Sequence, residues 1–110
     1  MATVYVVQEV RNRNFFPARK FGDLVALASA DSQVVLSATP MIQRLRSGLA
    51  NFNSEDYLLL SGDPIIMSLA VHIALQVNDG TATLLKWDKA SSDYYPVIID
   101  LNDEERDYGD

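Results

Sequence analysis

The same helix-start pattern occurs twice in this chain, and it constrains the fold more than any other feature of the sequence. Residues 36–45 (LSATPMIQRL) and 60–69 (LSGDPIIMSL) align at an offset of 24, with five of ten positions identical. In each copy a small residue, a polar residue and Pro lead from an apolar run into an apolar turn. Thr39 and Asp63 are predicted N-caps, because their side-chain oxygens can accept from backbone N–H groups of the first turn. Pro fits the next position, since its missing N–H would have no partner there.

These two units predict helices over residues 39–52 and 63–77, inside a strand–helix–strand–helix–strand unit that spans residues 33–89. Right-handed crossovers would make its three strands parallel. Alternating and β-branched runs predict strands over residues 3–10, 23–28, 33–37, 57–61, 81–89 and 94–101. The second and third are expected to form a hairpin, and Pro96 indicates an edge position or a bulge for the last. The fold class is therefore α/β, with a mixed sheet of about six strands, two helices and a partly parallel β-α-β-α-β core.

Composition places the chain among globular proteins, with 48% apolar and 22% charged residues. We expect a single domain over residues 1–102 and an acidic disordered tail over residues 103–110, which supply −4 of the net charge of −6. The absence of cysteine excludes disulfides and thiolate chemistry. The first residues lack the charged and apolar regions of a secretion signal. Polar residues interrupt the most apolar stretch, so we expect no membrane partner.

The two helix starts are one candidate binding site. In a parallel unit both would lie at the carboxyl ends of the strands, where open α/β sheets bind ligands. There is no glycine-rich phosphate loop, each Pro removes an amide donor, and the Asp63 carboxylate opposes an anion. Caps without a ligand are therefore the favoured interpretation, and Thr39 and Asp63 stay the site residues if a ligand does bind.

A basic and aromatic segment over residues 11–21 is the second candidate site. Its cations and the aromatic residues between them are Arg11, Arg13, Phe15, Phe16, Arg19 and Lys20. Arginine interleaved with aromatic rings suits single-stranded nucleic acid, whose bases stack and whose phosphates need cations. Against this, the whole protein is acidic, and aromatic residues of loops usually fold back onto the core.

The second predicted helix carries more apolar surface than one sheet can cover. Ten of the thirteen positions over residues 65–77 are apolar, and Ser68, His72 and Gln76 form one narrow polar stripe. A homodimer through this helix is one explanation. The other is intramolecular, with the first helix and the segment over residues 11–22 covering the surplus.

No catalytic constellation is visible in the sequence. His72 is the only histidine, and with no cysteine it has no usual partners for a triad or a zinc site. Its place on the polar stripe favours a solvated side chain. We expect no catalytic residue, no metal site and no cofactor, and hence a protein that is not an enzyme.

Several segments together resemble small accessory proteins encoded by tailed, especially short-tailed, bacteriophages. The resemblance covers residues 3–101 and rests on VYVVQEV (4–10), FGDL (21–24), DYLLLSGDP (56–64), LLKWD (84–88) and YPVIIDL (95–101). That family carries no established activity or site residues. The resemblance implies a phage protein made in the host cytoplasm, acting by binding a macromolecule.

Three functions follow. The first is a non-catalytic protein that binds a host or phage protein, favoured by the apolar second helix and the acidic tail. The second is a nucleic-acid or nucleotide binder that uses residues 11–21. The third is a virion decoration protein.

Overall fold

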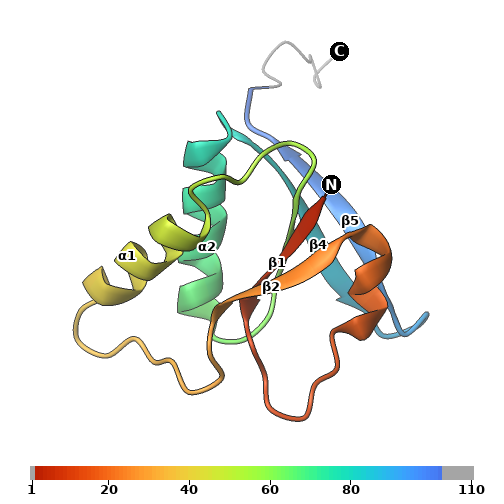
Figure 1. Ribbon diagram of the computed structural model, residues 1–110, viewed down its shortest axis with the longest axis horizontal. Coiled ribbons are helices and arrows are strands. Elements are labelled where there is room, and N and C mark those ends of the chain that lie inside the picture. The colour runs from red at the N-terminus through yellow and green to blue at the C-terminus, as the bar shows by residue number, and fades with distance from the viewer. Residues whose placement is uncertain (1, 103–110) are drawn as a thin grey trace, which may run out of the picture.

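Five strands form one sheet in the computed structural model, which describes residues 2–102 (Figure 1). The sheet order is β2-β1-β3-β4-β5, with β1–β2, β1–β3 and β3–β4 parallel and β4–β5 antiparallel. The elements in chain order are β1 (Thr3–Gln8), η1, a 3₁₀ helix (Phe16–Phe21), β2 (Asp23–Ala28), α1 (Thr39–Gly48), β3 (Tyr57–Leu59), α2 (Pro64–Val77), β4 (Thr81–Asp88) and β5 (Asp93–Asp100). This confirms the α/β class and the mixed sheet. The predicted acidic tail over residues 103–110 lies outside the described residues.

The predicted strand over residues 33–37 does not form, so the sheet has five strands instead of six. The segment holds only a single bridge between Val35 and Ser37, and the φ of +65° at Leu36 breaks the extended backbone. The hairpin with β2 was therefore wrong. Strands β2 and β3 are both parallel to β1, so α1 is the crossover helix between β2 and β3. The segment before α1 therefore only connects the end of β2 to the start of α1.

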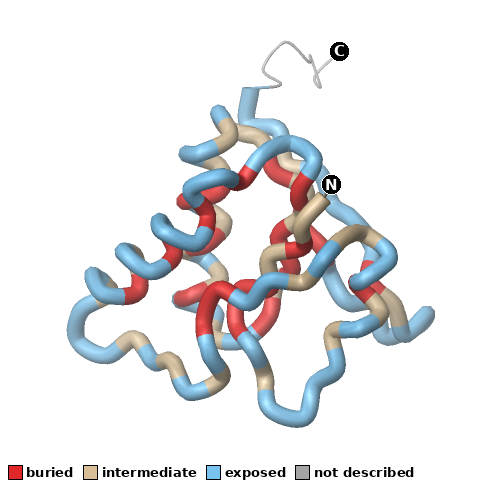
Figure 2. The backbone as a smooth tube through the Cα atoms, viewed as in Figure 1, coloured by how far each residue is buried: buried red, intermediate tan, exposed pale blue. Residues whose placement is uncertain are grey.

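The β-α-β-α-β core is present, but β2 takes the place of the missing strand and β1 lies between β2 and β3. Helices α1 and α2 lie together on one face of the sheet, and η1 lies on the other (Figures 1 and 2). The helix-side core includes Val7, Leu45, Leu58 and Ile66. The η1-side core is smaller and consists of Val4, Val6, Ala18, Leu59, Leu85 and Tyr94. Alternate residues of β1 and β3 thus point to opposite cores, as a strand buried on both faces requires.

The two helix starts differ. Asp63 is the N-cap of α2, and its Oδ1 accepts from the backbone N–H of Ile65 at 2.7 Å, as predicted. Thr39 is not a cap, because α1 already begins there and Ala38 precedes it as the N-cap residue, with no side-chain cap bond. The Ser37 hydroxyl instead accepts from the backbone N–H of Thr39 at 3.3 Å. Helix α1 ends at Gly48, earlier than the predicted Phe52.

Most of the apolar surplus of α2 is covered within the chain, and only Ile65 and Val77 of its ten apolar residues over 65–77 are exposed. Ile66, Ala70, Ile73 and Ala74 are buried, and Met67, Leu69, Val71 and Leu75 pack against the same core while partly exposed. The polar stripe of Ser68, His72 and Gln76 faces solvent, as predicted. Helix α1 contacts α2, whereas η1 contacts β1, β2 and β5 on the opposite side of the sheet. The segment over residues 11–22 therefore does not cover α2. Within residues 2–102, no helix is long and apolar enough to cross a membrane.

Candidate functional site

The carboxyl ends of the parallel strands are closed by one buried side chain, Gln8. Its Nε2 donates to the backbone carbonyls of Ser29 and Ser32 at 3.0 Å each, and its Oε1 accepts from the backbone N–H of Asp63 at 2.8 Å. Gln8 is 5% exposed. It is the last residue of β1, next to β3, where the strand order reverses and a ligand would be expected.

Gly62 shows how closely Gln8 fills this edge. A Cβ at Gly62 would lie 2.3 Å from Gln8 Oε1, and the φ of +92° also favours glycine there. Asp63 Oδ1 already caps α2. Thr39 and Asp63 line neither of the cavities described below. At the start of α2, protein groups therefore occupy the space next to Asp63, which acts as a cap, whereas Thr39 at the start of α1 caps nothing.

The buried polar groups are all satisfied. Ser61 Oγ donates to the Gln8 carbonyl at 2.6 Å and accepts from the Gln8 N–H at 3.3 Å. The two carboxylate oxygens of Asp56 accept from the backbone N–H groups of Thr3 and Asn53, both at 3.0 Å. Within residues 2–102, no buried side-chain nitrogen or oxygen lacks a partner, and no group of three or more His, Asp or Glu residues could hold a metal.

The basic and aromatic segment folds back onto the sheet. Phe15 and Phe21 pack against the η1-side core, whereas Phe16 is 65% exposed. Most of its cations face carboxylates: Arg11 pairs with Asp31, Lys20 with Asp93, and Arg19 with Asp23 at 4.0 Å. The ion pair with Lys20 contributes most to holding the pKa of Asp93 below its usual range. Binding the phosphates of an extended nucleic-acid strand would require these cations to be free of carboxylate partners.

Arg13 differs from the other three cations, since no carboxylate of the described chain lies within ion-pair distance of it. Its guanidinium lies 6.0 Å from the centre of the Phe15 ring. A cavity of about 300 Å³ is lined by Asn12, Arg13, Asn14, Trp87 and Tyr94. The sequence analysis predicts Arg13 as a binding residue but does not identify Trp87 and Tyr94. These two residues line the same cavity because they are paired across β4 and β5.

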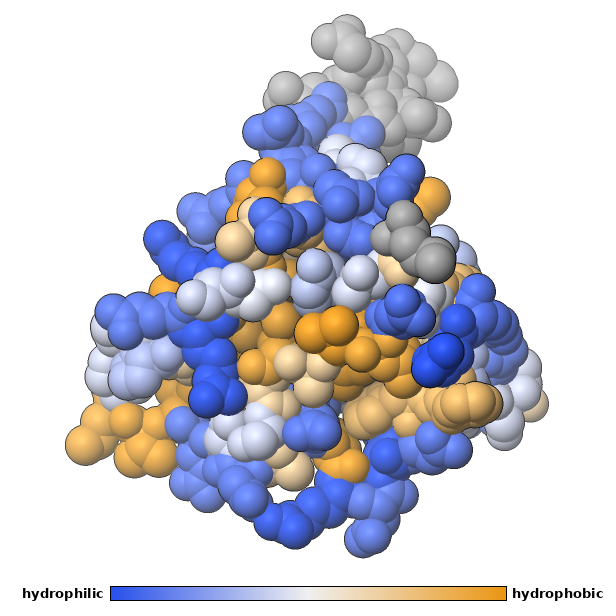
Figure 3. Space-filling model, viewed as in Figure 1, coloured by the Kyte–Doolittle hydropathy of each residue, from blue (hydrophilic) through white to orange (hydrophobic). Residues whose placement is uncertain are grey.

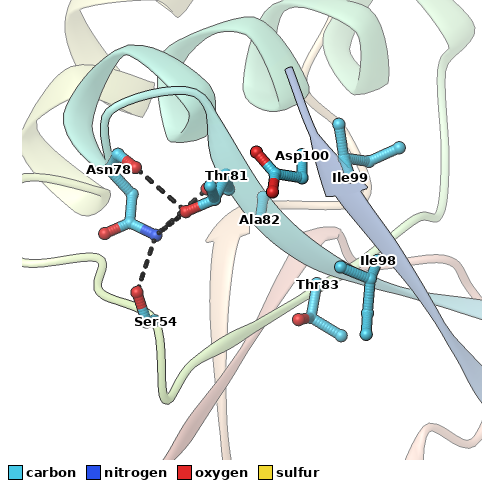
Figure 4. Close-up of a pocket in the computed structure, with 8 residues that line it drawn as sticks. All are labelled: Ser54, Asn78, Thr81, Ala82, Thr83, Ile98, Ile99 and Asp100. Atoms are coloured by element: carbon cyan, nitrogen blue, oxygen red, sulfur yellow. Dashed lines mark hydrogen bonds between the residues drawn. The ribbon is translucent and has the colours of Figure 1, made fainter. Parts of the chain in front are cut away.

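A second cavity, of about 200 Å³, lies where β4 begins and β5 ends (Figure 4). Its lining residues are Ser54, Asn78, Thr81, Ala82, Thr83, Ile98, Ile99 and Asp100. Asn78 Nδ2 donates to Ser54 Oγ at 3.2 Å and to Thr81 Oγ1 at 2.8 Å, which fixes one wall. Ile98 lies beside Thr83 in Figure 4 and is 77% exposed. The cavity therefore adjoins an exposed apolar side chain of β5.

The fold and its surfaces define a small α/β domain with a closed switch point and two surface cavities. The chain belongs to the family of the Phage Pam3 gp32-like protein, because that family's model matches residues 2–101. This confirms the resemblance to small proteins of tailed bacteriophages. No curated protein and no solved structure matches the chain.

Proposed function

We propose that this phage protein is a non-catalytic accessory protein that binds a host or phage protein, and that β5 carries the contact. The observation that supports this most is the 77% exposure of Ile98 in the middle of a sheet strand. Leu101 (63%) is exposed just after the end of β5, whereas Val97 (36%) points to the opposite face of the strand. Exposed apolar side chains that adjoin a cavity are candidate anchors for a protein partner. We call Ile98 and Leu101 the β5 surface.

The charge around the β5 surface indicates a basic partner. Asp100 lines the cavity beside Ile98, and the sequence over residues 103–110 carries five acids and one base. Complementary charge raises association rates and selects partners. We therefore expect a partner segment in which an aliphatic side chain enters the cavity and a neighbouring Lys or Arg faces Asp100.

Pro96 favours recognition by side chains over addition of a strand. The carbonyl of Leu85 accepts from the N–H of Leu60, the residue after β3, at 3.2 Å. The backbone N–H and C=O groups of alternate β4 residues therefore face β3, and those of the others face β5. Pro96 is paired with Leu85, and its backbone therefore faces outward from the sheet. A strand added at this edge would find no N–H at Pro96, which is how natural edges avoid pairing.

A photo-crosslinking residue at position 98 of the full chain tests the proposal in infected host cells. We expect one protein crosslinked at position 98, through a segment with aliphatic and basic residues, and none at position 36. Leu36 is fully exposed on the loop before α1, where Figure 3 also shows apolar surface, so it is a matched control. Purified partner should then bind the wild-type chain and the L36E variant equally, and the I98E variant at least tenfold more weakly.

The result against the proposal is a partner whose affinity is the same for the wild-type and I98E chains, or crosslinks at both positions alike. Crosslinks to nucleic acid would favour the second function instead. If the partner is a capsid or tail protein and the chain is present in purified virions, the protein binds its phage partner as a virion decoration protein.

A further inference from the structure

The cavity beside Arg13 has the features of a small-ligand site that is independent of the β5 surface. Its floor is a cross-strand aromatic pair, with the Trp87 and Tyr94 ring centres 4.9 Å apart at an interplanar angle of 68°. Trp87 and Tyr94 occupy a position of the ladder that lacks direct hydrogen bonds, where facing side chains approach most closely. Tyr94 is 4% exposed and Trp87 37%, so Tyr94 supports Trp87 from below and the indole reaches the cavity.

Arg13 supplies positive charge at this cavity. Its guanidinium lies beside the Phe15 ring, an arrangement that orients a cation without neutralising it. Burial raises the pKa of Tyr94, and the charge of Arg13 acts on that pKa in the opposite direction, which is consistent with a short distance between the two groups.

The remaining lining residues are two asparagines, whose side-chain amides can donate as well as accept hydrogen bonds. Asn14 Oδ1 accepts from the backbone N–H of Phe16 at 2.9 Å, which leaves the Asn14 amide nitrogen to donate elsewhere. Asn12 adds a second side-chain amide. None of the lining residues is acidic, and the two nearest carboxylates along the chain have partners of their own: Asp93 pairs with Lys20, and Asp88 accepts from Ser91.

An aromatic wall, a cation without a carboxylate partner in residues 2–102 and two side-chain amides suit a ligand with a flat ring and an anionic oxygen group. We propose that this cavity binds a nucleotide, with its base against Trp87 and its phosphate on Arg13. Aromatic side chains stack on any base, and arginine matches phosphate in geometry and charge. The nucleotide is either free or the end of a single strand, because both present the same base and phosphate.

The full-length protein offers its own probe, since Trp87 is the only tryptophan. Titration with thymidine monophosphate, thymidine and a 5′-phosphorylated oligothymidylate should quench its fluorescence saturably. We expect thymidine to bind about tenfold or more weakly than the monophosphate, as the loss of a hydrogen bond between charged groups requires. The R13Q variant should bind the monophosphate more weakly than wild type by the same factor. The R11Q variant is a matched change at an arginine that is paired with a carboxylate, and it should bind like wild type.

The oligonucleotide identifies the source of the ligand. Equal affinity for monophosphate and oligothymidylate indicates a free nucleotide, and tighter binding of the oligothymidylate indicates a strand end. No saturable quenching by either at millimolar concentration overturns the proposal, and so does equal weakening in R13Q and R11Q. The I98E variant should bind nucleotide normally, so this test is separate from that of the β5 surface.

Discussion

The side-chain oxygen of Gln8 accepts a hydrogen bond from the backbone N–H of Asp63 at 2.8 Å and so joins the end of β1 to the start of α2. The amide nitrogen of the same side chain holds the carbonyls of Ser29 and Ser32 after β2. One glutamine therefore connects three segments that the chain order keeps apart. Its position explains why the switch point of this sheet is closed.

The first prediction is that Q8A destabilises the fold. The substitution leaves one backbone N–H and two carbonyls without their partner, and a buried polar group left unsatisfied costs about 1–3 kcal/mol. Urea unfolding should show a lower midpoint with an unchanged slope. Q33A, at an exposed glutamine, is the control and should behave like wild type. A Q8A protein as stable as wild type would contradict this role of Gln8 and would make the carboxyl ends of the parallel strands a candidate ligand site again.

The second prediction contrasts the two helix starts. D63A removes the bond to the Ile65 N–H and should cost about 1 kcal/mol, up to about 2. For a domain of this size, the melting temperature should fall by about 4–8 °C per kcal/mol. T39A should change it little, because Thr39 caps nothing. Equal losses in the two variants, or a D63A protein as stable as wild type, would contradict this account of the caps.

Local signals in the sequence predicted most elements correctly. Strand β2 and the end of α2 lie where expected, and the start of α2 follows from Asp63 and Pro64 because a cap and a proline act within one turn. The strand predicted over residues 33–37 does not form, although Val34 and Val35 have high β propensity. The parallel pairing of β2 with β1, which local propensity does not reveal, decides the path of the chain there.

The sites were harder to predict because long-range register builds them. Arg13 meets Trp87 and Tyr94 only once β4 and β5 have paired and the segment after β1 has folded back. Gln8 gave no signal, since a single glutamine at the end of an apolar run is usually solvated. The charges of Arg11, Arg19 and Lys20 pointed to a binding surface, whereas their ion pairs depend on tertiary contacts.

The third prediction concerns Tyr5 and alkaline pH. Burial, and then the charge of Asp56, raise the pKa of Tyr5 above its usual value of 10.0. The folded state therefore holds this proton more tightly than the unfolded state. The stabilisation is complete below the unfolded pKa and is lost as pH rises through the folded pKa. Unfolding measured from neutral to strongly alkaline pH should show a smaller decline for Y5F than for wild type. An identical decline in the two proteins would exclude Tyr5 as its source.

The last prediction concerns self-association. A homodimer was one explanation for the apolar surplus of α2, but α1 and the sheet cover most of that surplus, and Pro96 interrupts the outer edge of β5. We therefore expect light scattering on the wild-type chain to give the monomer mass of 12.2 kDa as concentration rises.

P96V adds an outward N–H without breaking a bond to β4, so it should fold normally and associate at high concentration through the opened edge. I65E changes the most exposed apolar residue of α2 and is the matched control, which should stay monomeric. A wild-type dimer that I65E dissociates would instead establish an interface through α2.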